Sequence, residues 1–141
     1  MEVTFEVYTS LIQEIKDIRT MVFVFEQGFN DEFDETDNNA VHILLVVDDV
    51  PAGTARIIFN KKHQLYSVSR VAILSQYRHL GLGKELMNYV EQEIIKRYGH
   101  VLIGVSAQSR VEEFYTKLGY NATEERYLDE SCPHVWMIKQ L

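Results

Sequence analysis

Hydrophobic and polar positions follow two different periods at the start of the chain. Apolar side chains alternate with polar ones over residues 3–7, which predicts a strand. They then recur at helical spacing over residues 10–24, which predicts an amphipathic helix, and Ser10 and Gln13 have the spacing of a capping box. Over residues 26–39 the pattern dissolves, so we expect a loop there, with at most a short helical turn.

The rest of the chain consists of short apolar runs and two further helical patterns. Helical spacing predicts a long helix from Leu82 that ends at Gly99, and a short helix that ends at Gly119. The apolar runs predict strands over residues 41–47, 52–59, 68–74, 101–105, 121–127 and 134–139. The order is β-α-β-β-β-α-β-α-β-β. It predicts an α/β fold (an α+β mixed sheet) with helices on both faces, in a single domain over residues 1–141.

Composition and charge narrow the class of protein. With 141 residues, 46% of them hydrophobic, the chain is long enough to form a core. Its net charge of −7 argues against a nucleic-acid partner, because binding a phosphate backbone needs a basic face. The acidic character suits a cationic substrate, although solubility explains a charge of this size equally well.

Cysteine usage and the N-terminus bear on location. Cys132 is the only cysteine, which excludes an intrachain disulfide and a cysteine-based zinc site, and we expect no metal. The default for such a chain is a reducing compartment, the cytoplasm. The first residues lack the features of a signal peptide and no apolar run is long enough for a membrane span, so we expect no membrane partner.

The stretch Arg78-His79-Leu80-Gly81-Leu82-Gly83-Lys84 joins a predicted strand to the long helix. Strand, glycine loop and helix form an anion cradle, because glycines let the backbone approach a ligand and the first helical N–H groups have no internal partner. We therefore predict that a phosphorylated small molecule binds here. The amides that would hold it are those of His79, Leu80, Gly81, Leu82, Gly83 and Lys84. The cations of Arg78 and Lys84 could pair with its phosphates or could be solvated.

Two common nucleotide-binding loops do not fit this stretch. A P-loop requires a glycine where Arg78 stands and a hydroxyl where Glu85 stands. A dinucleotide fingerprint requires a third glycine where Leu86 stands. ATP and NAD are therefore weak candidates.

Two longer motifs and two shorter stretches of the chain resemble those of a known family. Val71-Ala72-Ile73-Leu74 followed by Arg78-x-x-Gly81-x-Gly83 resembles motif A of the GNAT superfamily of N-acetyltransferases, and Phe114-Tyr115-x-x-Leu118-Gly119-Tyr120 resembles the end of its motif B. Residues 22–27 and Pro133-His134 resemble the ElaA-like subgroup. The resemblance implies a GNAT-like acyl-CoA N-acyltransferase fold, in which the strands ending near Leu74 and Val105 splay apart around acetyl-CoA. It also implies acetyl transfer to a primary amine of a small molecule, by direct attack in a ternary complex.

The resemblance further implies roles for individual residues. The backbone N–H of Ile73 would lie near the thioester carbonyl, and Val71 and Ala72 would make backbone contacts with the pantetheine arm. Tyr115 would be the general acid that protonates the leaving thiolate, or else a residue that packs in the core or against the cofactor. Gln108 would reach the cofactor from the end of its strand, where the family often has Asn.

Several residues are candidates for the general base. Glu26 follows the first predicted helix, where the family forms its acceptor wall. His134 precedes the final strand, and histidine is the residue type that changes protonation near neutral pH. His42 and water are alternatives. A covalent route through Cys132 is conceivable, although the family's usual route is direct transfer.

Alternative functions also remain open at this point. One is a non-catalytic acyl-CoA-binding or regulatory module, and another is a protein or peptide N-acetyltransferase. The acidic residues between Glu26 and Asp37 could bind a polyamine or an aminoglycoside-like cation, but we expect a mobile, solvated loop there. Many relatives are dimers, so a homodimer is an open expectation.

Overall fold

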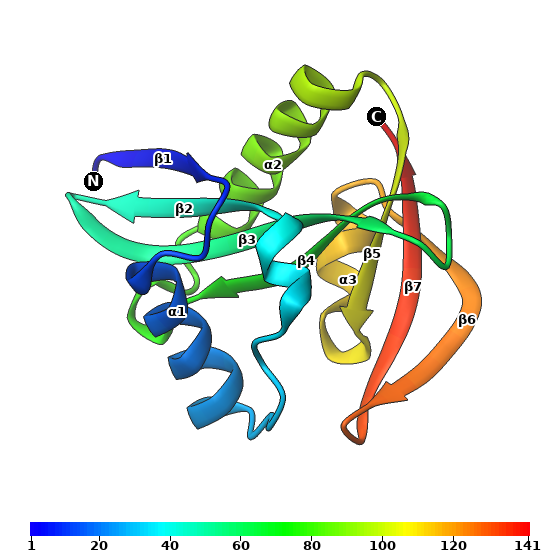
Figure 1. Ribbon diagram of the computed structural model, residues 1–141, viewed down its shortest axis with the longest axis horizontal. Coiled ribbons are helices and arrows are strands. Elements are labelled where there is room, and N and C mark those ends of the chain that lie inside the picture. Colours follow the sequence, from blue (N-terminus) through cyan, green and yellow to red (C-terminus); the bar gives the residue numbers. More distant parts are fainter.

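The computed structural model describes residues 1–141, and its strands form a seven-stranded sheet with the order β1-β2-β3-β4-β5-β7-β6 (Figure 1). The strands are β1 (Val3–Tyr8), β2 (Val41–Val47), β3 (Val50–Asn60), β4 (Leu65–Ile73), β5 (Leu102–Gln108), β6 (Asn121–Asp129) and β7 (Cys132–Gln140). The helices are α1 (Gln13–Arg19), α2 (Leu82–Tyr98) and α3 (Glu112–Lys117). The mixed sheet and the predicted order of elements are confirmed.

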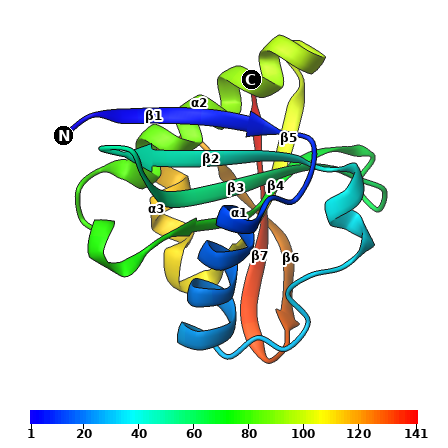
Figure 2. The same ribbon diagram turned by 60° about the vertical axis from the view of Figure 1, so that its left-hand side comes forward.

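Strand β2 explains why helices cover both faces of the sheet. Its run Val41–Val47 is buried at every position. Ile43 and Leu45 pack in the core that contains α2 and Tyr115 of α3, whereas Leu44 and Val46 pack in a second cluster with α1. A strand that is apolar on both sides needs a layer on each side to exclude water. Figure 2 shows α1 and α2 separated by the sheet.

The sheet opens between β4 and β5, as the resemblance implied. The two strands pair in parallel only from Tyr66 to Val68 on the β4 side, although β4 continues to Ile73. A register shift in the pairing of β3 with β4 marks a β-bulge, and Arg70 within it has φ of +53°. A bulge bends its strand and increases the local twist. The bend carries the end of β4 away from β5 and leaves a gap.

The N-terminal helix differs from the prediction in two ways. Its N-cap is Ile12, which makes no side-chain capping bond, so the predicted capping box of Ser10 and Gln13 does not form. The reason is that Ser10 lies outside the first turn, too far from the N–H groups it would cap. After Arg19 the helix continues as a π-helix, Thr20–Glu26.

Three short 3-10 helices complete the chain, at Glu35–Asn39, Ser75–Tyr77 and Ser109–Val111. The first of them is the short helical turn that we expected within residues 26–39. Gly99 and Gly119 end their helices with positive φ, as predicted. None of the helices is both long enough and apolar enough to cross a membrane.

Candidate active site

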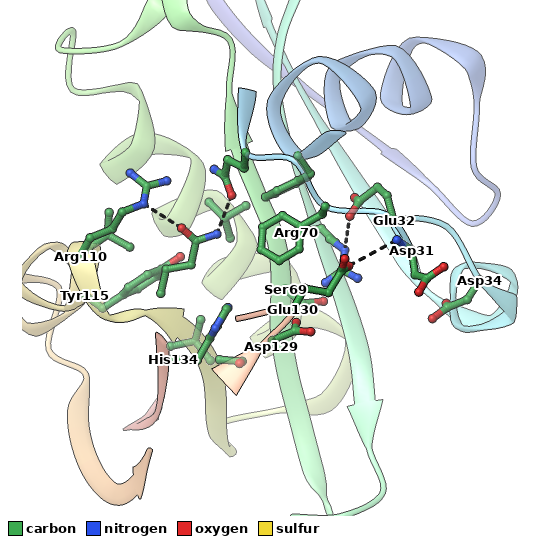
Figure 3. Close-up of a pocket in the computed structure, with 18 residues that line it drawn as sticks. Asp31, Glu32, Asp34, Ser69, Arg70, Arg110, Tyr115, Asp129, Glu130 and His134 are labelled. Atoms are coloured by element: carbon green, nitrogen blue, oxygen red, sulfur yellow. Dashed lines mark hydrogen bonds and ion pairs between the residues drawn. The ribbon is translucent and has the colours of Figure 1, made fainter. Parts of the chain in front are cut away.

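A cavity of about 390 Å³ lies where β4 and β5 diverge (Figure 3). Val71 of β4, Ser106 of β5, Tyr115 of α3 and His134 of β7 line it. The segment after the π-helix and the turn between β6 and β7 also contribute, through Gln27, Phe29, Asp31, Asp129 and Glu130 among others. A second hollow adjoins it, because Gln27, Phe29, Gln108, Arg110 and Glu130 line both. Distant parts of the chain therefore meet around one continuous cleft.

The end of β4 presents backbone groups to the gap. Leu74 N–H donates to the carbonyl of Ala52 at 2.9 Å, and Ile73 lies opposite Gly53. This register makes Ile73 and Gly53 a non-hydrogen-bonded pair, so the N–H of Ile73 points away from β3 and toward the open side. The alternation of a strand turns the backbone groups of Ala72 back toward β3. Of the three residues predicted to contact the cofactor here, Val71 lines the cavity and Ile73 directs an N–H into the gap.

The glycine loop enters α2 through two residues with left-handed backbone, His79 (φ +64°) and Gly81 (φ +76°). A Cβ on Gly81 would meet no atom within 4 Å, so glycine is needed there for its backbone angle. Gly83 has a different role, because a Cβ there would lie 3.2 Å from the ring of Phe114. Its missing side chain lets α2 and α3 pack closely. The N–H groups of the first turn of α2 have no partner within the helix, as an anion cradle requires.

Arg78 and Glu26 form an ion pair that the sequence did not predict. Arg78 Nη1 and Nη2 each donate to one oxygen of Glu26 at 2.9 Å, and Arg78 Nε donates to the carbonyl of Ile73 at 2.9 Å. A phosphate would have to compete with Glu26 for Arg78. Glu26 in turn has both oxygens occupied, which makes it a poor candidate for the general base. Lys84 is exposed.

Tyr115 is only 6% exposed and packs edge-on against the rings of Phe114 and Tyr120. Burial raises the pKa of Tyr115 well above the ordinary phenol value. The phenol is therefore protonated at neutral pH and can donate a hydrogen bond into the cavity it lines. Full proton transfer to a thiolate is uphill for such a weak acid, so hydrogen-bond donation is the role the geometry favours. The cofactor-packing alternative also fits, because Tyr115 belongs to the main core.

His134 lies on the same side of the cavity as Tyr115 (Figure 3). It is 7% exposed, and its Nδ1 lies 2.8 Å from the carbonyl of Cys132. A carbonyl only accepts, so Nδ1 carries the hydrogen and the neutral ring keeps a lone pair on Nε2. That lone pair could accept the proton of an amine. His42, by contrast, is fully buried beside Asp37, so it cannot contact an amine substrate. Burial also lowers its pKa.

Gln108 connects three parts of the cleft. Its Nε2 donates to Gln27 Oε1 at 2.7 Å, and its Oε1 accepts from Arg110 Nε at 2.9 Å. Gln108 thus links the end of β5 to the residue after the π-helix. Cys132 lines the adjoining hollow rather than the main cavity.

The acidic segment is anchored to the sheet, which corrects our expectation of a mobile, solvated loop. Glu32 and Asp37 are buried. Arg19 donates to Glu32 Oε2 at 2.8 Å and to Asp37 Oδ1 at 2.7 Å, and Arg56 donates to Asp37 at 3.0 Å. Burial alone would raise the pKa of Asp37, but the hydrogen bonds and charges of Arg19 and Arg56 outweigh it and lower the pKa to about 2.

Sequence reasoning missed the arginines that hold this segment. Arg19 comes from α1, Arg56 from β3 and Arg70 from β4, and Arg70 Nε lies 3.0 Å from Glu32 Oε1. An available signal was that Arg56 and Arg70 each interrupt an otherwise apolar or small-residue stretch of a strand, whereas Arg19 lies in a helix with other charged residues and carries no such signal. Buried arginines need acidic partners, and the acidic segment holds six carboxylates between Glu26 and Asp37 with no basic residue among them.

Comparisons with known proteins agree with this geometry. A family model described as an acetyltransferase (GNAT) domain matches residues 13–141. The chain belongs to the GNAT family. It is thus an N-acetyltransferase, and acetyl transfer from an acyl-CoA is the reaction that its family and fold support.

Individual relatives span nearly the whole chain. BSU40680 of Bacillus subtilis, named as a presumed acetyltransferase, is 40% identical in an alignment of 130 positions that covers 88% of this chain and 86% of that one. Escherichia coli ElaA is 24% identical over 96% of this chain and 92% of its own length, which agrees with the ElaA-like resemblance.

Solved structures share the fold. An acyl-CoA N-acyltransferase from Pseudomonas aeruginosa superposes with a TM-score of 0.83, 26% identity and 98% coverage of both chains. The ElaA crystal structure gives a TM-score of 0.85 at 21% identity, covering 99% of this chain and 100% of that one. A Bacillus subtilis acetyltransferase in complex with CoA gives 0.75 at 16% identity, with 99% of each chain covered.

Proposed function

We propose that this protein transfers the acetyl group of acetyl-CoA to a primary amine of a small molecule, by direct attack in a ternary complex. The observation that carries the proposal is the open edge of β4. There the N–H of Ile73 points into a gap beside a cavity lined by Tyr115 and His134. Such an arrangement brings a hydrogen-bond donor, a phenol and an imidazole to one place.

The residues around the gap fit acetyl-CoA. The first amides of α2 and the open space above Gly81 suit a pyrophosphate, because free N–H groups and the positive end of the helix dipole attract an anion. Val71 and Ile73 offer backbone groups along the open edge of β4. That a relative of the same fold was crystallised with CoA supports this assignment. The cosubstrate supplies a thioester, whose carbonyl carbon the amine attacks.

Three side chains and one backbone N–H of the cleft then have defined tasks in the reaction. His134 accepts a proton from the amine at Nε2, since an ammonium has no lone pair with which to attack. The N–H of Ile73 stabilises the negative charge that develops on the thioester oxygen. Tyr115 donates a hydrogen bond to the sulfur as the carbon–sulfur bond breaks and the carbon–nitrogen bond forms. Glu26 holds Arg78, and therefore the glycine loop, in position.

The size of the cavity favours a small acceptor over a protein. Its volume of about 390 Å³ lies at the small end of the range for small-molecule pockets. Glu130 accepts hydrogen bonds from the N–H groups of Asn30 and Asp31 and so narrows the approach that a polypeptide would need. The single domain, the cytoplasmic location, the homodimer and the absence of a metal stay predictions of the sequence.

A thermal-shift measurement followed by turnover tests this proposal. Acetyl-CoA or CoA at about 100 times Kd should add about 2.7 kcal/mol of stability, which is a shift of several degrees, whereas ATP and NAD should add none. Release of CoA in the presence of an amine panel then measures transfer. If neither acetyl-CoA nor CoA stabilises the protein, the glycine loop serves another purpose and the proposal fails.

The catalytic assignment is tested by His134→Gln. We expect kcat to fall by about 100-fold or more, because general-base catalysis contributes that much, while stabilisation by acetyl-CoA is unchanged. Tyr115→Phe should also lower kcat more than it lowers the affinity for acetyl-CoA. Unchanged kcat in either variant would remove that residue from the mechanism.

A further inference from the structure

Arg70 occupies the bulge of β4 in a left-handed backbone conformation, with φ of +53°. Few residues other than glycine adopt this region, and they cluster at ligand-binding sites, where the strain serves a purpose. Arg70 lines the cavity, close to Ser69 and Glu130 (Figure 3). The strained backbone thus holds a guanidinium at the cavity.

The hydrogen bonds of Arg70 are incomplete. Its Nε lies 3.0 Å from Glu32 Oε1 but is buried without a hydrogen bond, and Glu32 is its one ionic partner. Arg19, in the same network, uses Nε, Nη1 and Nη2 as donors to Glu32 and Asp37. A guanidinium offers five N–H donors. Arg56 donates through Nε to Ser69 and through Nη1 to Asp37, whereas Arg70 donates no hydrogen bond. Arg70 is therefore the arginine of this network with the most donors left for a ligand.

The charges of the network point the same way. Arg19, Arg56 and Arg70 share two buried carboxylates, those of Glu32 and Asp37, so one positive charge is in excess. The excess falls on Arg70, because it alone of the three lines the cavity. Glu130 forms no ion pair with Arg70 and accepts from the N–H groups of Asn30 and Asp31. The hydrogen bond from Asn30 and, to a smaller extent, the nearby charge of Arg70 lower the pKa of Glu130, so Glu130 offsets part of that charge but leaves the N–H donors of Arg70 unpaired.

A purely anionic ligand would nevertheless be repelled. Further carboxylates line the cavity, those of Asp31, Asp34, Asp129 and Glu130, and they outnumber the arginines. A ligand that combines a negative group with an ammonium satisfies both sets of charges, because the carboxylates attract the ammonium and Arg70 attracts the anion. Planar carboxylates match the fork of a guanidinium.

We propose that Arg70 binds a carboxylate of the acceptor, so that the acceptor is a small amino carboxylate such as an amino acid. The inference rests on the proposed function, from which it takes the amine. It assigns Arg70 as the residue that selects amino carboxylates over simple amines, polyamines and carboxamides.

Matched pairs of acceptors test the inference. L-Amino acids, their carboxamides and their decarboxylated amines are compared by CoA release with acetyl-CoA, and by calorimetry with the CoA-bound protein. We expect the best amino acid to exceed its carboxamide by about 10- to 100-fold in kcat/KM, as one charge-assisted contact provides. Arg70→Gln should remove this preference mainly through KM, and Arg70→Lys should restore part of it.

Arg126→Gln is the matched control, because Arg126 also pairs with a glutamate, Glu112, but lies outside the cavity. It should keep the preference. Acetyl-CoA should stabilise Arg70→Gln as it does the natural protein, which shows that this variant folds. Equal use of acids and carboxamides, or a preference that survives Arg70→Gln, overturns the inference and leaves the proposed function standing.

Calorimetry separates the remaining outcomes. Absence of turnover with every amine would count against the proposed function, yet binding of amino acids that depends on both the carboxylate and Arg70 would still support a carboxylate site. If no L-amino acid binds better than its carboxamide, the inference is wrong.

Discussion

The glycine loop, residues 78–84, and the acidic segment, residues 26–39, meet at the ion pair between Arg78 and Glu26, but different forces hold them. The loop depends on backbone geometry, namely left-handed residues and the first turn of α2. The acidic segment depends on side chains from distant elements, because Arg19 and Arg56 neutralise its buried Asp37. The difference teaches that a local motif can be recognised in the sequence, whereas a buried charge network appears only when its partners are brought together.

The largest effect should come from breaking the network. Asp37→Ala leaves Arg19 and Arg56 without their shared partner, and removing one member of a buried ion pair costs about 3–5 kcal/mol. Denaturant unfolding measures this loss. Glu113→Gln is the control, since its pair with Lys117 is exposed, and it should leave stability unchanged. Equal stability of the two variants would mean that the network does not hold the segment.

Acid should weaken the same network more gently. The pKa of Asp37 is lowered from 3.8 to about 2, so its contribution is fully present above pH 3.8 and is lost as pH falls toward 2. The shift corresponds to about 2 kcal/mol. Burial raises the pKa of Glu32, which acts with the opposite sign, so the difference between the natural protein and Asp37→Asn isolates Asp37. If that difference is constant from pH 5 to pH 2, the assignment is incorrect.

Two glycines at opposite ends of α2 test the loop. Gly81 and Gly99 both have positive φ and open space at the Cβ position. Alanine at Gly81, in the left-handed helical region, should cost about 1 kcal/mol of stability, and alanine at Gly99 about 1–3 kcal/mol, because its ψ of −169° lies in a region essentially restricted to glycine. Only Gly81→Ala should also weaken the thermal stabilisation by acetyl-CoA, because only Gly81 begins the anion cradle. Equal loss of cofactor binding in both variants would indicate a general effect on the helix.

The ion pair that joins the two regions should have the smallest effect. Glu26→Gln removes one charge of a pair whose side chains are about one-third exposed, so we expect stability to change by less than about 1 kcal/mol. The pH dependence of kcat should keep its shape, since Glu26 only positions Arg78. Loss of the acidic limb of that profile would instead identify Glu26 as the base.

Much of the fold was predictable because its signals are local. The apolar run Val41–Val47, the spacing along α2 and the glycines at helix ends each act over a few residues. The predicted capping box at Ser10 was wrong because it rested on a local spacing alone. The spacing was right, but the helix begins at Gln13, where packing places it. Of the predicted base candidates, Glu26 forms an ion pair with Arg78 and His42 is buried. The spacing of residues along the sequence could indicate neither.

By itself, the sequence determined the order of elements, the glycine loop and membership of an N-acetyltransferase family, because periodicity and backbone angles belong to neighbouring residues. Only the tertiary structure decided which charges are paired and which face the cavity. Ion pairs and burial depend on residues that are far apart in the chain. Asp37 lies 19 positions from Arg56, and Arg78 lies 52 from Glu26. Arg70 faces the cavity because the bulge of β4 turns it there, and that bulge exists only in the assembled sheet.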